Sequence, residues 1–242
     1  MNETDDDTTV RLARRVAELT GCSRREAAHY VEGGWVTVDG NVVETPQTEI
    51  GDEVVVLLPG AKAEEPEPAT FLLHKPAGVA IADAIALVAP ENRAADDPFR
   101  IRALQRHFIR RSAPLPLSAN ASGLMVVTQD AKLVRRLNDD AERIEHELNV
   151  EVSGEIAMYG LARLNHGLGD LSPRPLPTAK VSWQNETTLR FAIKALQPGQ
   201  IEAMCAAVGL QAVAIRRIRL GRISMAKLPV GQWRYMARHE RF

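Results

Sequence analysis

Cysteine, aromatic residues and long apolar runs are all scarce in this chain of 242 residues. Its two cysteines, Cys22 and Cys205, lie far apart and in no metal-binding spacing, which argues against a disulfide framework and favours a reduced intracellular protein. No apolar run approaches the roughly 18 residues of a membrane span. The acidic start, MNETDDDTT, is unlike a signal peptide. We therefore expect a cytoplasmic protein without membrane association, with a disordered tail at residues 1–9.

The chain also lacks a large net charge, since its formal charge at pH 7 is −1. The charge is nevertheless unevenly distributed between the two ends of the chain. Residues 1–60 contain five arginines, no lysine and an excess of acidic residues, whereas residues 190–242 are rich in Lys and Arg. A basic segment can be a surface for a polyanion or only a set of solvated helix and strand faces. Charge alone leaves both interpretations open.

The segment 112–129 contains no residue that ionises near neutral pH. It consists of a loop of small polar residues, a glycine at position 123 that permits a tight or positive-φ backbone, and an apolar β-branched run at 124–128. A loop followed by a buried strand commonly presents a functional side chain. If this loop is a reaction centre, its acid or base is missing.

Residues 10–58 have the pattern of a small helix-helix-hairpin domain. Residues 10–19 have a helical period that ends at Gly21, and Ser23 with Glu26 forms a capping box for a second helix that ends at Gly33. Short strands are expected at 36–38, 42–43 and 53–58. Residues 59–69 have the composition of a linker.

The remaining residues, 70–242, predict strands interspersed with helices. Strands are expected at 71–74, 124–128, 145–152, 181–183, 188–193, 213–218 and 233–236, and helices at 100–111, 130–138 and 200–208, with a partly helical stretch at 81–95. Asp130 is expected to cap its helix. Three prolines at 173, 175 and 177 predict an extended loop. The expected fold class is α+β, with a mainly antiparallel sheet and flanking helices.

All basic residues of the acidic N-terminal segment lie at two neighbouring places, in the first helix and at the start of the second. Arginine binds phosphate in two-point geometry, and helix N-termini favour anions. Exposed arginines can also serve only solubility. Together with the motif CSRREAAHYVEGGWVTVDGNVV, these residues resemble the small RNA-binding domain named after ribosomal protein S4. The resemblance implies an RNA surface formed by Arg11, Arg14, Arg15, Ser23, Arg24 and Arg25.

Four further motifs, in the same order along the chain, resemble the RsuA-type and RluF-type bacterial ribosomal-RNA pseudouridine synthases: HKPAG at 74–78, SGLMVVTQD at 122–130, EHELNVEV at 145–152 and RRIRLGRISMAKLPVGQWRYM at 216–236. This family isomerises uridine in RNA after the base has left its stack, without metal or cofactor. The resemblance implies no cofactor for this chain, ribosomal RNA as its partner, and an additional RNA contact from Lys75. We expect a monomer.

At three positions where the family carries functional residues, this sequence has different residues. The essential aspartate of the family falls at Ser118, five residues before Gly123. The tyrosine beneath the target base falls at Leu148, and an arginine-rich helix falls at residues 199–204, where one arginine has become Glu202. A serine hydroxyl needs an adjacent base to act as a nucleophile. His74 or His107 could supply one, but no sequence feature places either beside Ser118.

Three hypotheses remain. The first is an RNA-binding protein with the synthase fold that no longer isomerises uridine. The second is an active synthase with a relocated catalytic group, and the third is a protein-interaction module that has also lost RNA affinity.

Overall fold

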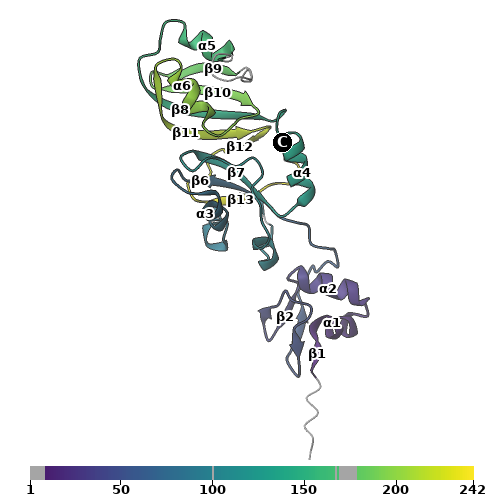
Figure 1. The fold of residues 1–242 in the computed structure, drawn as a ribbon. Helices are drawn as coiled ribbons and strands as arrows, with labels where there is room; N and C mark the ends of the chain where they lie inside the picture. Colours follow the sequence, from purple (N-terminus) through teal and green to yellow (C-terminus); the bar gives the residue numbers. More distant parts are fainter. Residues whose placement is uncertain (1–8, 100, 167, 169–178) are drawn as a thin grey trace, which may run out of the picture. The chain divides into compact units, whose positions relative to one another are not determined.

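The computed structural model describes residues 9–99, 101–166, 168 and 179–242, which fold into two units (Figure 1). The first unit contains residues up to Pro68 and, in addition, Arg102–Ile109. The second contains Ala69–Ile101 and Arg110–Phe242. The chain therefore passes from one unit to the other three times.

The first unit pairs two helices with short strands. Its helices are α1 (Leu12–Thr20) and α2 (Arg24–Glu32). The capping box of α2 is confirmed, since the Glu26 amide donates to Ser23 Oγ at 3.3 Å and the Ser23 amide donates to the Glu26 carboxylate at 2.9 Å. Gly21 ends α1 in the left-handed region, at a φ of 69°. The two apolar faces meet in a core built from Leu12, Val16, Ala27, Val31, Val36 and Ile50.

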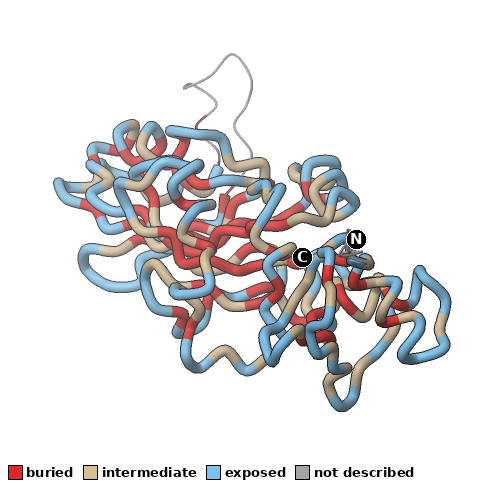
Figure 2. Tube along the Cα trace, turned by 90° about the horizontal axis from the view of Figure 1, so that it is seen from below, coloured by how far each residue is buried: buried red, intermediate tan, exposed pale blue. Residues whose placement is uncertain are grey.

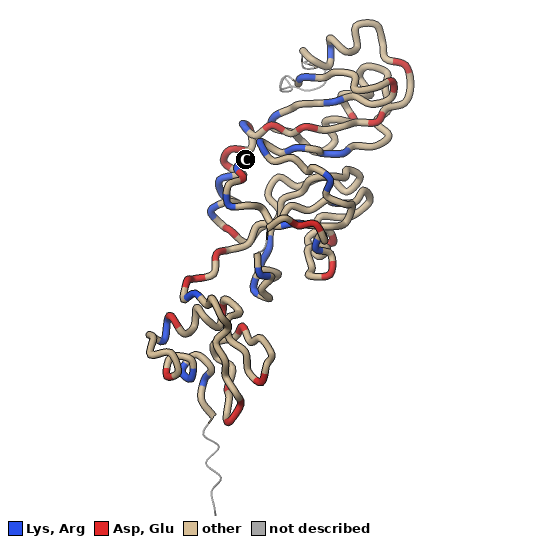
Figure 3. The backbone as a smooth tube through the Cα atoms, turned by 180° about the vertical axis from the view of Figure 1, so that it is seen from behind, with Lys and Arg blue, Asp and Glu red and all other residues tan. Residues whose placement is uncertain are grey.

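Five short strands complete this unit: β1 (Val10–Arg11), β2 (Val36–Val38), β3 (Asn41–Val42), β4 (Glu49–Ile50) and β5 (Val55–Leu57). β2 lies between β3 and β5, and β1 pairs with β4, all antiparallel. β1 and β4 are two residues long and were not predicted. Arg14 and Arg15 lie in α1, Arg24 and Arg25 begin α2 and Arg11 lies in β1, and basic and acidic residues are both spread over this unit (Figure 3).

The helix predicted at residues 100–111 is wrong. Among the described residues of this range, 101–111, only the 3-10 turn η2 (Gln105–Phe108) forms, and residues 101–104 before it have no regular structure. Arg102 lies over the Trp35 ring, 4.4 Å from its centroid, the Gln105 amide donates to Glu44 at 2.7 Å, and Arg106 pairs with Glu32 at 3.1 Å. These contacts hold the segment against α2 and the following strands of the first unit, and tertiary contacts of this kind override a helical period.

The second unit is built on one long mixed sheet. Its main strands are β6 (Thr70–Lys75), β7 (Ser122–Thr128), β8 (Glu145–Gly154), β9 (Lys180–Asn185), β10 (Thr188–Lys194), β11 (Leu210–Leu220) and β13 (Trp233–Tyr235). They are ordered β13-β6-β7-β11-β8-β10-β9, and β12 (Ile223–Ser224) pairs with β11. Among the described strands of this sheet, only β7 and β11 run parallel, and the other pairs are antiparallel. The α+β class with a mainly antiparallel sheet is confirmed.

Gly123 is required where β7 meets β11. Its φ is 106°, and a Cβ at this position would overlap the carbonyl oxygen of Arg217 and lie 2.7 Å from its amide nitrogen. Only glycine allows this approach of the two backbones. The parallel contact joins the two antiparallel halves of the sheet, each with its own apolar core. Figure 2 shows the buried residues concentrated along these strands.

Short helices flank the sheet: α3 (Ile81–Ala86), α4 (Ala131–Asp139), α5 (Gly160–His166) and α6 (Gln200–Ala206), with the 3-10 turn η1 (Pro90–Asn92). The Asp130 cap of α4 is confirmed, because its carboxylate accepts from the amides of Lys132 and Leu133. α5 was not predicted. The proline-rich loop predicted around residues 173–177 lies outside the described residues.

Candidate functional site

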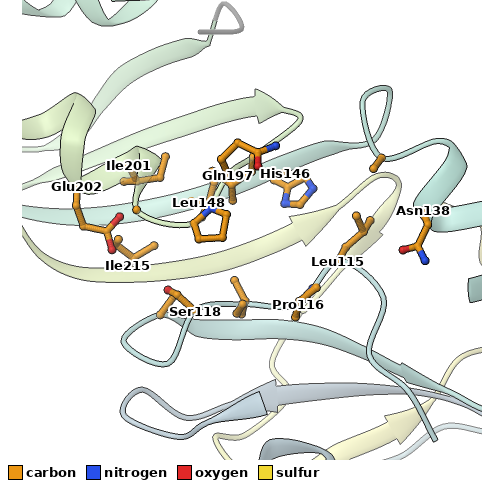
Figure 4. Close-up of a pocket in the computed structure, with 16 residues that line it drawn as sticks. Leu115, Pro116, Ser118, Asn138, His146, Leu148, Gln197, Ile201, Glu202 and Ile215 are labelled. Atoms are coloured by element: carbon orange, nitrogen blue, oxygen red, sulfur yellow. The ribbon is translucent and has the colours of Figure 1, made fainter. Parts of the chain in front are cut away.

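A pocket of about 290 Å³ lies at the junction of the two halves of the sheet (Figure 4). Its walls come from the loop before β7, from β8 and β11, and from the start of α6. Most of the lining is apolar, and its polar side chains are Ser118, Asn138, His146, Gln197 and Glu202. No Lys or Arg lines the pocket among the described residues, so its walls offer no cation to a phosphate.

Ser118 lies at the pocket on a loop whose backbone carbonyls accept hydrogen bonds from the Lys75 ammonium. The Ala121 amide donates to the Ser118 carbonyl at 3.2 Å, which closes a turn. The Lys75 ammonium donates to the carbonyls of Pro76, Ala119 and Ala121, each at 2.9 Å. The turn therefore presents Ser118 from a rigid support.

The resemblance implied that Lys75 contacts RNA, which would require an exposed ammonium group. Its side chain is completely buried, and burial lowers its pKa. Its three hydrogens are directed at backbone carbonyls, so in this conformation it organises the loop rather than facing a ligand.

Two side chains of β8 face the pocket. Leu148 is buried and provides an apolar wall. His146 is also buried, and burial together with the neighbouring Arg217 charge lowers its pKa to about 3. With so low a pKa, His146 is a weak base and accepts a proton poorly from the Ser118 hydroxyl. No described hydrogen bond joins the two residues.

Arg217 fixes the tautomer of this histidine. Its Nη1 lies 3.3 Å from His146 Nδ1 and 2.9 Å from the Leu115 carbonyl oxygen, and its Nε donates to the Leu124 carbonyl at 2.7 Å. A guanidinium group only donates, so Nδ1 accepts and the ring proton resides on Nε2. Arg217 is completely buried, and burial lowers its pKa to about 9.

Glu202, in the first turn of α6, is the one carboxylate among the described lining residues. It is half-buried, and no described residue donates a hydrogen bond to it. Figure 4 shows Glu202 and Ser118 on opposite walls of the pocket. A carboxylate thus faces the pocket from α6, where the motif resemblance led us to expect arginines.

The histidines considered as bases for Ser118 are not in this pocket. His74 Nδ1 lies 2.7 Å from the Leu228 carbonyl oxygen, which makes that nitrogen a donor. His107 belongs to the 102–109 segment of the first unit, where burial lowers its pKa to about 4. Within the described residues, no three His, Cys, Asp or Glu side chains lie close enough to share a metal ion.

In the first unit, three of the six residues expected to bind RNA meet at one place. Arg11, Arg14 and Arg24 line a pocket of about 460 Å³ between the two helices and the loop that leads to β4. Arg11 and Arg24 are exposed. Arg14 pairs with Glu18 at 2.9 Å, but both side chains are mostly in solvent, where such a pair is weak.

The other three residues are placed differently. Arg15 is half-buried and donates to the Gly51 carbonyl at 3.3 Å. Arg25 is 80% exposed and lies 3.9 Å from Glu65 of the segment that follows the first unit's strands. Ser23 uses its side chain in the capping box, where its hydrogen bonds lower the pKa of Glu26. The structure thus brings Arg11, Arg14 and Arg24 together, and Arg25 lies next to Arg24 in the sequence.

Sequence reasoning overlooked the roles of Asn138, Gln197 and Arg217. Asn138 and Gln197 line the pocket from opposite sides of the sheet junction, and neither belongs to a motif. The available signal for Arg217 was its place in a β-branched strand two residues after Ile215, because the alternation of a strand puts these two residues on the same face.

Comparison with known proteins agrees with this architecture. Residues 10–56 match the S4 domain family. The chain has the fold of a crystal structure titled pseudouridylate synthase, with a TM-score of 0.59 and 18% identity, over 94% of this chain and 96% of the other. The fold is thus that of a pseudouridine synthase with an N-terminal S4 domain.

Relatives extend along nearly the whole chain. It is 26% identical to the ribosomal large subunit pseudouridine synthase B of Bacillus subtilis, over 95% of this chain and 93% of that protein. It is 27% identical to the dual-specificity RNA pseudouridine synthase RluF of Escherichia coli, over 94% of this chain and 76% of that protein. The chain is a relative of the RsuA-type and RluF-type pseudouridine synthases. In the described residues, no helix is long and apolar enough to cross a membrane.

Proposed function

We propose that this protein binds ribosomal RNA and does not isomerise uridine. The observation that carries the proposal is the chemistry of the pocket. Ser118 stands where the family resemblance puts the essential aspartate, and Leu148 stands where it puts the tyrosine. His146, the histidine among the described lining residues, is a weak base with a pKa of about 3. A hydroxyl without a base is a poor nucleophile at neutral pH.

RNA binding is assigned to residues 10–58, followed by a linker at 59–69 and a synthase-like domain at 70–242. The exposed arginines of the first unit support this assignment, since Arg11, Arg14 and Arg24 share one concave surface. We expect the protein to act as a monomer in the cytoplasm, in ribosome assembly or as an RNA chaperone.

One observation favours a second candidate function, an active synthase with a relocated carboxylate. Glu202 faces the same pocket as Ser118. However, Glu202 lies on the wall opposite Ser118, and no described Lys or Arg lines the pocket to bind the phosphates of a target nucleotide. We therefore prefer the first candidate.

The experiment that separates the two maps pseudouridine in total cellular RNA from strains with and without the gene. The first candidate predicts identical maps. A site that disappears on deletion and returns with the wild-type gene, but not with Glu202→Gln, would establish the second. Loss of a site that returns with both versions of the gene would also contradict the first candidate and would place the catalytic group elsewhere.

A further inference from the structure

Two polar groups of the pocket have no hydrogen-bond partner among the described residues. No described residue donates to the Glu202 carboxylate, and none accepts from His146 Nε2–H, although the imidazole is buried. The surrounding walls are apolar, formed mainly by Leu115, Leu117, Leu148, Ile201 and Ile215. Neither group belongs to the fully buried atoms that lack a hydrogen-bond partner, so both are accessible from the pocket and available to a ligand that enters it.

The charge of the pocket restricts the kind of ligand. Glu202 is an acceptor only, and no described cation lines the walls. A phosphate would face a carboxylate without compensation, so the part of the ligand that enters is neutral and carries N–H donors. The apolar walls suit the faces of a flat ring, and an unstacked nucleobase has both properties.

The bases differ in what their edges offer to a carboxylate. Uracil presents one N–H between two carbonyl oxygens, and those oxygens would be repelled by Glu202. Cytosine and adenine each present an amino group beside a ring nitrogen that accepts. Guanine alone presents two adjacent donors, N1–H and the N2 amino group, which match the two oxygens of a carboxylate, and its O6 lies on the same edge as an acceptor for a donor such as His146 Nε2–H.

We propose that this pocket binds an unpaired guanine, with Glu202 as the residue that determines specificity, His146 as a second contact and Arg217 as the positioning residue that keeps the His146 proton on Nε2. This inference rests on the proposed function, since it names the base that an RNA-binding protein without isomerase activity would hold. The pocket would then prefer guanine over uracil, whereas the pocket of a uridine-modifying enzyme would prefer uracil.

Equilibrium dialysis of the full-length protein against tritiated nucleosides tests the pocket without the phosphates that the S4 domain would bind. Guanosine is expected to bind most tightly. Inosine lacks the N2 amino group and should bind about tenfold more weakly, since a two-point contact to a base edge contributes roughly 1–3 kcal/mol. Uridine should bind most weakly of the natural nucleosides.

Glu202→Gln is the decisive variant, because it keeps the size of a half-exposed side chain and removes one acceptor. It should lower guanosine affinity at least about fivefold and abolish the difference between guanosine and inosine. The matched control is Glu186→Gln, in the exposed turn between β9 and β10, which should leave both affinities unchanged. Equal or tighter binding of uridine, or unchanged guanosine binding by Glu202→Gln, overturns the inference.

The same protein preparations are also tested for binding to a ribosomal RNA fragment at low salt. If RNA binds but no nucleoside is retained, or none is preferred, the guanine inference fails while the proposed function stands. If the folded protein does not bind RNA, the proposed function fails as well.

Discussion

The two units of the molecule use basic side chains in opposite ways. In the first unit, Arg11, Arg24 and Arg25 are exposed. In the second, Lys75 and Arg217 are completely buried and directed at backbone carbonyls and a histidine. An exposed arginine remains available to a polyanion, whereas a buried cation that donates to backbone carbonyls supports the fold. The first unit therefore offers exposed cations, whereas the described residues that line the pocket of the second unit include no Lys or Arg.

The largest effect on stability is expected from the buried lysine. Lys75→Met leaves the carbonyls of Pro76, Ala119 and Ala121 without their donor, and unpaired buried acceptors are costly. We expect the free energy of unfolding of the second unit to fall by roughly 3 kcal/mol, measured by urea denaturation. Lys132→Met, at an exposed position on α4, serves as the control and should change it little. Equal stability of both variants would show that Lys75 does not hold the loop.

The exposed arginines should instead control affinity. Arg24→Glu combined with Arg25→Glu should weaken binding to a ribosomal RNA fragment about tenfold or more at low salt, and the loss should shrink as salt is added, since phosphate contacts are screened. Filter binding or fluorescence anisotropy over a salt series measures both. The control is Arg222→Glu with Lys227→Glu, an equal change of charge at exposed positions of the second unit. If the control weakens binding as much, the RNA surface has been assigned to the wrong unit.

The buried histidine of the pocket predicts a pH dependence of stability. His146 has a pKa of about 3 in the folded state and an ordinary value of 6.5, so the unfolded chain binds the extra proton between these pH values. Stability therefore falls as the pH drops below about 6.5, by up to about 1.4 kcal/mol per pH unit for this group. In His146→Asn the slope between pH 6 and 4 should be smaller by that amount. Parallel slopes for the two proteins would mean that His146 is not buried as a neutral ring.

A smaller effect is expected at the 102–109 segment. Arg102→Ala removes a cation from the face of Trp35, an interaction that contributes about 0.5–1 kcal/mol at a partly exposed site. Thermal unfolding of the first unit should shift slightly, while Arg143→Ala, whose side chain is 86% exposed, should have no effect. An unchanged midpoint in Arg102→Ala would indicate that the segment contributes nothing to the stability of the first unit.

The smallest effect is expected from restoring one acidic group. Ser118→Asp should not generate measurable pseudouridine, because Leu148 offers no hydroxyl-bearing ring and the nearby Glu202 charge raises the pKa of a new carboxyl. Rapid isomerisation of an RNA fragment by this single variant would show that the rest of the pocket is still competent.

Local signals in the sequence predicted much of this structure. The capping box at Ser23 and Glu26, the cap at Asp130 and the strand that starts beside Gly123 are short-range patterns, and each is confirmed. The helix expected at 100–111 failed because Arg102, Gln105 and Arg106 contact residues more than 60 positions away in the chain. A periodic pattern contains no information about such contacts.

The pocket could be predicted only in part, for the same reason. Ser118 and Leu148 follow from motif order, but the position of Glu202 opposite Ser118 depends on how α6 packs against the sheet. The buried state of Lys75 depends on carbonyls 44 and 46 residues away. The motif resemblance identified Ser118, Leu148 and Glu202 as differences from the family. Only the packed structure shows which side chains lie together in the pocket.

The central claim is that this protein binds RNA without isomerising uridine, and one experiment measures both properties in the same sample. The purified full-length protein is incubated with ribosomal RNA fragments, and the bound RNA is recovered and sequenced for pseudouridine. The account predicts salt-sensitive binding with no pseudouridine above the level of a protein-free control. Pseudouridine that accumulates with time in the wild-type sample and is absent with Glu202→Gln would contradict it.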